Sequence, residues 1–189
     1  MNLTDIAKLL GAAKEQINHA DFVILGSISV IGLVKLKNIP GRMLMSNDLD
    51  CYPLGDPGRA FDLNTTLGLG SPYEIENGLY LDPVSPRLPT LPTEWEKRLV
   101  HLKLDNGVTI HCLDPNDAAI SKYARGEIRD REWIRAGLKG AILDIATISS
   151  RLRRTDFLDA DEAAKARKLI EADRKWIASI KSPSSDFGM

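Results

Sequence analysis

Apolar residues recur at helical spacing near the beginning of the chain and again in its last third. Residues 3–18 carry apolar side chains at intervals of three and four, which predicts an amphipathic helix. Asp114 followed by Pro115 is typical of a helix N-terminus, so the pattern changes to helix at this point. It predicts four helices from here on, at about 115–125, 127–138, 145–153 and 160–180.

Shorter apolar runs between these helices predict strands. Residues 22–25 are wholly apolar, as expected of a strand that is buried on both faces. Asp105, Asn106 and Gly107 indicate a hairpin turn between two alternating strands. A short helix is expected at 28–35, and residues 53–78, rich in Gly, Pro, Asp and Asn, predict a loop with room for one short helix. The further strand candidates lie within 43–52 and at 78–81, 99–104 and 108–113.

These elements divide the chain into a mixed strand and helix core, 1–113, an all-helical region, 114–181, and a frayed tail, 182–189. The strand order cannot be read from the pattern. A length of 189 residues is consistent with one compact unit, and 43% hydrophobic residues are enough for a packed core. A formal net charge of −1 excludes a strongly basic nucleic-acid arm and a long acidic tail.

Cysteine usage and the apolar stretches indicate where the protein works. Cys51 and Cys112 are far apart and form no disulfide framework, so a reducing cytoplasm is expected. No signal peptide is predicted, because no basic segment precedes an apolar run at the N-terminus. The longest apolar stretch, 22–34, is too short and too interrupted for a membrane span, so no membrane partner is expected.

Two acidic residues on a predicted strand are the first candidate for chemistry. Side chains at i and i+2 of a strand share a face, so Asp48 and Asp50 project together while Leu49 points into the core. Two neighbouring carboxylates repel each other unless water solvates them or a cation lies between them. Magnesium prefers such oxygen ligands together with substrate phosphates, and two metal ions can align an attacking hydroxyl and a leaving pyrophosphate.

A glycine and a serine follow the buried strand at 22–25. Gly26 lets a phosphate approach the backbone, and Ser27 offers a hydroxyl and an N–H group where a helix begins. Lys122, on a later helix, could neutralise the charge of leaving phosphates. Each feature alone has a plainer explanation, namely a solvated acid pair, a turn and a surface lysine, and their order along the chain is what makes the combination moderately specific.

The segment 22–27 followed by Ser46-Asn47-Asp48-Leu49-Asp50 resembles the first two motifs of the DNA polymerase beta-like nucleotidyltransferase superfamily. The long spacing, and the serine two residues before the first aspartate, look more like its AbiEii-type branch. Residues 111–130 are similar to a stretch of uncharacterised bacterial relatives, in which a helix that opens with Pro and Asp carries a Lys. The likeness covers about 22–140, and it implies an α+β fold with a mixed sheet flanked by helices.

The resemblance also implies roles for individual residues. Gly26, Ser27, Ser46 and Lys122 would bind the nucleotide, and Asp48 and Asp50 would bind Mg²⁺ or Mn²⁺. Asp130 would position Lys122 or Arg125, although a first-turn acid of the next helix explains it equally well.

Many family members have a third carboxylate that acts as the base for the incoming hydroxyl. Asp82, after the strand at 78–81, is the candidate here. Asp105 is the rival, although its hairpin turn explains it without chemistry.

The leading hypothesis is therefore a cytoplasmic, magnesium-dependent nucleotidyltransferase. It would move a nucleotidyl group from a nucleoside triphosphate to a hydroxyl of an RNA end, a protein or a small molecule. The resemblance further implies a bacterial toxin–antitoxin or phage-defence setting, with an antitoxin-like protein partner. Two alternatives stay open: an inactive protein of this fold that binds nucleotide or a protein partner, and an interaction module whose acid pair is merely solvated.

Overall fold

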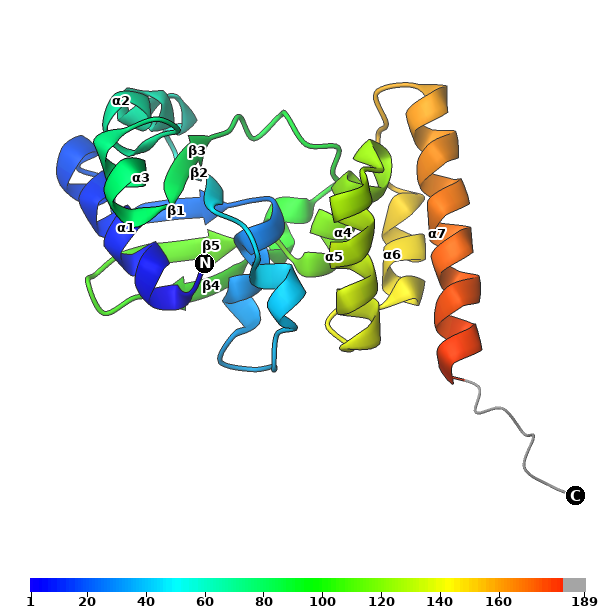
Figure 1. Cartoon of the computed structure of the whole chain (residues 1–189). Coiled ribbons are helices and arrows are strands. Elements are labelled where there is room, and N and C mark those ends of the chain that lie inside the picture. The colour runs from blue at the N-terminus through cyan, green and yellow to red at the C-terminus, as the bar shows by residue number, and fades with distance from the viewer. Residues whose placement is uncertain (182–189) are drawn as a thin grey trace, which may run out of the picture.

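The computed structural model of this chain describes residues 1–181 (Figure 1). Its α-helices are α1 (Leu3–Ile17), α2 (Asn64–Leu67), α3 (Pro72–Asn77), α4 (Pro115–Arg125), α5 (Ile128–Lys139), α6 (Ile145–Leu152) and α7 (Ala160–Lys181). Its strands are β1 (Asp21–Ile24), β2 (Asp48–Pro53), β3 (Tyr80–Pro83), β4 (Val100–Lys103) and β5 (Thr109–Cys112). Short 3-10 helices complete the fold: η1 (Ser27–Leu33), η2 (Gly41–Leu44), η3 (Pro57–Leu63) and η4 (Trp95–Arg98).

The five strands form one mixed sheet in the order β3-β2-β1-β5-β4. Strand β1 pairs in parallel with β5 and antiparallel with β2, while β2 pairs in parallel with the edge strand β3. The hairpin predicted around Gly107 is confirmed, since β4 and β5 are antiparallel neighbours. The central strand β1 therefore ends between β2 and β5, and the chain leaves the sheet there through Gly26.

The two faces of the sheet are covered differently. Side chains of α1, η3 and α2 pack on one face against Phe22, Ile24, Leu49 and Leu81, which are almost wholly buried. Because side chains alternate along a strand, Asp48 and Asp50 project from the other face. On that face Val23 and Tyr52 join a second core, which includes Trp95 and residues of the C-terminal helices.

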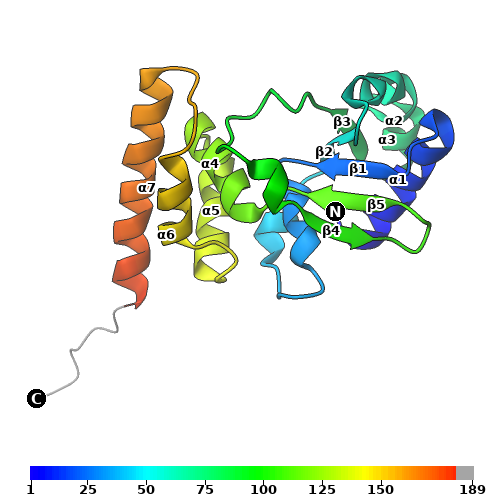
Figure 2. The same ribbon diagram turned by 180° about the vertical axis from the view of Figure 1, so that it is seen from behind.

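Helices α4 to α7 stand together at one end of the sheet (Figures 1 and 2). Residues 84–94, which follow β3, cross from the sheet towards these helices. This crossing segment is fixed at its far end, where the Thr93 N–H donates to the Arg154 carbonyl at 2.8 Å and Pro92 forms a β-bridge with Thr155. The crossing segment thus links the sheet to the C-terminal helices.

The mixed α+β architecture is as expected, but residues 53–78 correct the prediction of a loop with one short helix. They form η3, α2 and α3. Leu63 and Leu67 anchor this region on the sheet, and the Ser71 hydroxyl caps α3 by accepting from the Glu74 N–H. Individually weak helices are stabilised here by packing, which a local pattern does not register.

Other predictions have mixed outcomes. The helix expected at 28–35 is the 3-10 helix η1, which begins at Ser27. The tail 182–189 lies outside the described residues, and the division of the chain at residue 113 stays a prediction. Within residues 1–181, no helix is both long enough and apolar enough to cross a membrane.

Candidate active site

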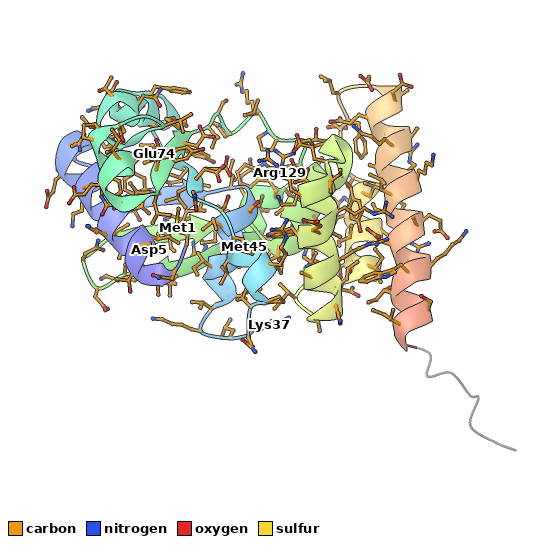
Figure 3. The ribbon with its side chains drawn as sticks, in the orientation of Figure 1. Met1, Asp5, Lys37, Met45, Glu74 and Arg129 are labelled. Atoms are coloured by element: carbon orange, nitrogen blue, oxygen red, sulfur yellow. The ribbon has the colours of Figure 1, made fainter. Side chains whose placement is uncertain are left out.

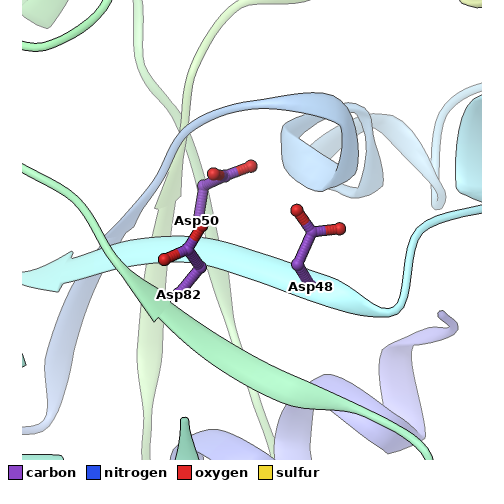
Figure 4. Close-up of side chains that lie close together, drawn as sticks. All are labelled: Asp48, Asp50 and Asp82. Carbon is purple, nitrogen blue, oxygen red and sulfur yellow. The ribbon is translucent and has the colours of Figure 1, made fainter. Parts of the chain in front are cut away.

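Three aspartates gather on the sheet face that looks towards the helices. Strands β2 and β3 pair so that Asp50 lies opposite Asp82, and Asp48 lies two residues before Asp50. One carboxylate oxygen from each of the three lies within 4.8 Å of the others. Figure 4 shows Asp48 and Asp50 on β2 and Asp82 on the adjacent β3. The expectation that Asp48 and Asp50 share a face, with Leu49 in the core, is confirmed.

The electrostatics of these acids reflect their crowding. Burial and then the neighbouring charges of Asp48 and Asp82 raise the pKa of Asp50 from 3.8 to about 6. Burial, followed by the charge of Asp48, also raises the pKa of Asp82. Three hard oxygen donors this close repel one another when charged, and they are a fitting set for a divalent cation, which would relieve the repulsion.

Gly26 is shaped by its contact with this acid group. Its φ of +61° lies in the left-handed region, which glycine adopts without a steric penalty. A Cβ atom on Gly26 would lie 1.8 Å from Oδ2 of Asp50, so the carboxylate occupies the space that any other residue would fill. The Leu25 N–H donates to the Asp50 carbonyl at 2.9 Å, which fixes this backbone beside β2. Only glycine therefore fits at position 26, where the end of β1 lies against the Asp50 carboxylate.

Gly26 and Ser27 form a glycine-serine corner at the end of β1, and Lys122 approaches this corner from α4. Its Nζ donates to the Ser27 hydroxyl at 2.8 Å and lies 3.1 Å from Oδ1 of Asp130. Arg125 makes a two-pronged contact with Asp130, with Nε at 2.8 Å and one terminal nitrogen at 2.6 Å. Lys122 and Asp130 are both buried, whereas Arg125 is half exposed. The predicted contact of Asp130 with Lys122 or Arg125 is found with both.

Burial and charge pull against each other in this cation cluster of Lys122, Arg125 and Asp130. Burial lowers the pKa of Lys122, and the charge of Asp130 acts in the opposite direction. Burial acts to raise the pKa of Asp130, but the hydrogen bond from Arg125 and the charge of Lys122 outweigh it, so the pKa is lowered. Asp130 is therefore ionised at neutral pH and favours the charged form of Lys122.

Trp133 holds the glycine-serine corner against the helices. Its indole N–H donates to the backbone carbonyl of Ser27 at 3.2 Å and to that of Met43 at 3.1 Å. Its ring lies 5.0 Å from the Lys122 Nζ, which is within the range of a cation–π interaction. The Trp133 side chain is buried and packs in the core.

A cavity of about 500 Å³ joins these groups. The acids form one part of its wall, and Gly26, Ser27 and Lys122 form another. Val84, Leu88 and Thr90 of the crossing segment line it on a further side. Met45 and Arg129, which also line it, lie where the sheet meets the helices (Figure 3). The cavity thus has carboxylates, cations and apolar surface within one space.

The predicted site residues fall into two groups. Gly26, Ser27, Ser46, Asp48, Asp50, Asp82 and Lys122 all line this one cavity. The Ser46 hydroxyl donates to the Asp48 carboxylate, so in this state it orients an acid. Asp105 is not among these residues: it is exposed in the turn between β4 and β5, beyond the opposite edge of the sheet from β3.

Sequence reasoning missed several residues of the site. Arg42, Arg129 and the crossing segment line the cavity, and no local motif marks them. The Thr90 hydroxyl donates to Glu162 of α7 at 3.0 Å, which ties the crossing segment to the last helix. Tyr80 lies beside the site but outside the cavity lining, and the register of β2 and β3 places it opposite Asp48. Burial and then the charges of Asp48 and Asp82 raise the pKa of Tyr80.

Comparison with protein families matches residues 1–182 to a family described as nucleotidyltransferase of unknown function (DUF6036). Because the match covers nearly the whole chain, the protein belongs to this nucleotidyltransferase family. The comparison does not identify the AbiEii-type branch. Neither the curated proteins nor the solved structures gave a match.

Proposed function

We propose that this chain is a magnesium-dependent nucleotidyltransferase that moves a nucleotidyl group from a nucleoside triphosphate to an acceptor hydroxyl and releases pyrophosphate. The observation that carries the proposal is one cavity in which three carboxylates lie beside a glycine-serine corner with a buried lysine on it. The family assignment supports the same general reaction.

Asp48 and Asp50 would hold the divalent ion or ions, and Asp82 lies beside them. One oxygen from each of the three carboxylates lies within 4.8 Å of the others, and the repulsion between the acids favours the binding of such an ion. When bound, the ion neutralises charge on the reacting phosphates and orients them. Ser46 keeps the Asp48 carboxylate turned into the site through its hydroxyl.

The glycine-serine corner and Lys122 would take the pyrophosphate end of the nucleotide. Gly26 lacks a side chain that would block the backbone, and Ser27 is the first residue of η1, so its N–H group lies at the beginning of that helix. Lys122 is held against Ser27 by Asp130 and Trp133, so its charge is oriented before substrate arrives. Pre-oriented charge of this kind stabilises the negative charge that develops on the leaving group.

Asp82 would accept the proton of the acceptor hydroxyl. It comes from the edge strand β3, on the other side of β2 from the phosphate corner. A carboxylate that lies beside the metal-holding acids can accept the proton that the attacking hydroxyl loses. The nature of the acceptor, whether RNA, protein or small molecule, and the toxin–antitoxin or phage-defence setting stay predictions.

The test compares the wild-type chain with Asp48→Asn. Each nucleoside triphosphate, labelled at the α-phosphate, is supplied with Mg²⁺ and a panel of RNA, protein and small hydroxyl acceptors, and released pyrophosphate is measured. Asp105→Asn is the matched control, because its carboxylate lies in the exposed β4–β5 turn. We expect turnover by the wild type and the control but not by Asp48→Asn.

Equal turnover by Asp48→Asn would contradict the proposal. Calorimetry with Mg²⁺ and nucleotide separates the remaining outcomes. Binding without pyrophosphate release for any acceptor would favour an inactive nucleotide-binding protein, and no binding of metal or nucleotide would favour an interaction module.

A further inference from the structure

Tyr80 completes a patch of four side chains on the acidic face of the sheet. It pairs directly with Asp48 across β2 and β3, and it lies two residues before Asp82 on the same strand. Residues i and i+2 of a strand share a face, and paired strands lie ~4.8 Å apart. The Tyr80 ring therefore projects beside Asp48 and Asp82, and it is only partly buried.

The position of Tyr80 is opposite to that of the phosphate corner. In the sheet order β3-β2-β1, Tyr80 comes from β3, the acids come from β2, and Gly26 and Ser27 follow β1. Tyr80 is not among the residues that line the cavity, whereas Gly26, Ser27 and Lys122 are. Nucleotidyl transfer by in-line displacement needs the attacking oxygen and the leaving pyrophosphate on opposite sides of the α-phosphorus.

The other described tyrosines do not have this placement. Tyr123 is buried and its hydroxyl donates to Asp173 between the helices. Tyr52 follows Asp50 by two residues on β2, but its side chain is buried in the core. Tyr73 lies on α3, where it packs on the opposite face of the sheet and its ring meets Lys8. Tyr80 is thus the phenol that the register brings to the acids.

We propose that Tyr80 is a self-nucleotidylation site, at which the protein transfers a nucleotidyl group from its own bound nucleoside triphosphate to the Tyr80 hydroxyl. This inference rests on the proposed function and goes beyond it, because it names an acceptor. The Tyr80 oxygen forms a bond to the α-phosphorus, and the bond from that phosphorus to the pyrophosphate oxygen breaks. The phenolic proton passes to the Asp82 carboxylate, and pyrophosphate leaves on the side of Ser27 and Lys122.

The modification would limit the enzyme's own activity. A nucleotidyl group on Tyr80 would stand on the β3 side of the acids, beside Asp82, which is the proposed base for an external hydroxyl. The modified protein should therefore transfer to other acceptors more slowly than the unmodified protein.

The test incubates the purified chain with Mg²⁺ and each nucleoside triphosphate, and follows intact mass and peptide mass. We expect the mass of one nucleotidyl group on the peptide that contains Tyr80. Tyr80→Phe removes only the hydroxyl and should stay unlabelled. Tyr73→Phe is the matched control and should be labelled like the wild type. A mixture of Tyr80→Phe, which has an intact site, with Asp48→Asn, which has Tyr80, should also stay unlabelled if the transfer occurs within one molecule.

Two results would overturn the inference. One is equal labelling of Tyr80→Phe and the wild type. The other is an unlabelled wild type that nevertheless binds Mg²⁺ and an α,β-methylene nucleoside triphosphate in calorimetry, a result that leaves the proposed function standing. A wild type that binds neither would overturn this inference and the proposed function together.

Discussion

Two charged clusters face the same cavity, and they differ in how their charges are balanced. The acid cluster of Asp48, Asp50 and Asp82 holds three carboxylates within 4.8 Å. The ionic contacts described for residues 1–181 give none of these acids a basic partner within ion-pair distance. The cation cluster contains its own counter-charge, since Asp130 bonds both Lys122 and Arg125.

The difference shows that the charges of the cation cluster are balanced without a ligand, whereas those of the acid cluster are not. The buried charges of Lys122 and Asp130 satisfy each other, so the cation cluster is formed before any ligand arrives. Burial and then the charges of neighbouring acids raise the pKa of Asp50 and of Asp82, which is a cost that a bound cation would offset. The acid cluster is thus a binding site for positive charge, and the cation cluster is a rigid support for negative charge.

Asp50→Asn is the substitution expected to change the acid cluster most. Loss of a metal-holding carboxylate should remove several kcal/mol of transition-state stabilisation, or about a 1,000-fold loss of transfer. The same change should stabilise the metal-free protein at pH 8. Because the folded pKa of Asp50 is raised to about 6, its contribution to stability is present below pH 4 and is lost as the pH rises through 6.

Urea unfolding in EDTA at pH 4 and pH 8 measures this effect. The pKa shift of Asp50 corresponds to about 3 kcal/mol of stability that the wild type loses between these pH values and that Asp50→Asn keeps. Asp105→Asn serves as the control and should follow the wild type. Identical pH dependence of wild type and Asp50→Asn would mean that the acids are not strained by one another.

Gly26→Ala tests the geometry that joins the two clusters. The new Cβ would displace the Asp50 carboxylate, and a misplacement of about 1 Å can cost ~100-fold in rate. Gly70→Ala is the matched control, because Gly70 also has a positive φ, of +78°, but a Cβ there meets nothing within 4 Å. Both variants place a side chain at a positive φ, so each carries backbone strain. Equal transfer rates for the two variants would argue that Asp50 needs no fixed position.

These positions show what the sequence could predict. The period of two placed Asp48 and Asp50 on one face, because strand geometry is local. The pairing of Asp50 with Asp82 depends on the register of β2 and β3, which side-chain alternation does not determine across separate strands. Asp82 was preferred to Asp105 because a hairpin turn already explained the latter, and the structure brings Asp82 to the acid pair.

Long-range contacts were beyond local reasoning for a physical reason. Lys122 and Ser27 are 95 residues apart, and their contact depends on how α4 packs at the end of β1. The order of the motifs along the chain made Lys122 a candidate, although a lone lysine is typical of a surface, and the resemblance to known nucleotidyltransferases then implied its contact with the nucleotide. Arg42 and the crossing segment had no such resemblance to mark them, so the cavity wall that they form was missed.

Asp130→Asn is expected to weaken the cation cluster. Without its counter-charge, nothing from Asp130 offsets the effect of burial, so the pKa of Lys122 falls further and the lysine loses its proton more readily. Loss of a charged hydrogen bond corresponds to about 1.5–3 kcal/mol, or about 10-fold or more in nucleotide affinity. Calorimetry with Mg²⁺ and nucleotide should find that affinity recovers as the pH falls.

Breaking a buried ion pair can also unfold the protein, at a cost of about 3–5 kcal/mol. Arg125→Gln provides a second variant, because Arg125 is half exposed and Lys122 keeps its contact with Asp130. It should reduce affinity less than Asp130→Asn does and leave the pH dependence unchanged. If Asp130→Asn weakens binding equally at every pH, Asp130 acts on the fold and not on the charge of Lys122.

Arg129→Gln should have the smallest effect and sharpens the distinction between buried and exposed charge. Arg129 lines the same cavity as Lys122, but its side chain is 70% exposed and pairs with Glu127 at 2.8 Å. Exposed ion pairs are worth about 0.2–1 kcal/mol, so nucleotide affinity should fall only about two- to five-fold. That loss should shrink when affinity is measured in 0.5 M salt, because salt screens exposed charges, whereas the loss in Asp130→Asn should persist.

Arg174→Gln, on α7 and outside the cavity lining, is the control and should bind nucleotide like the wild type. A loss in Arg129→Gln as large as that in Asp130→Asn, and insensitive to salt, would mean that burial does not set the strength of the cation cluster.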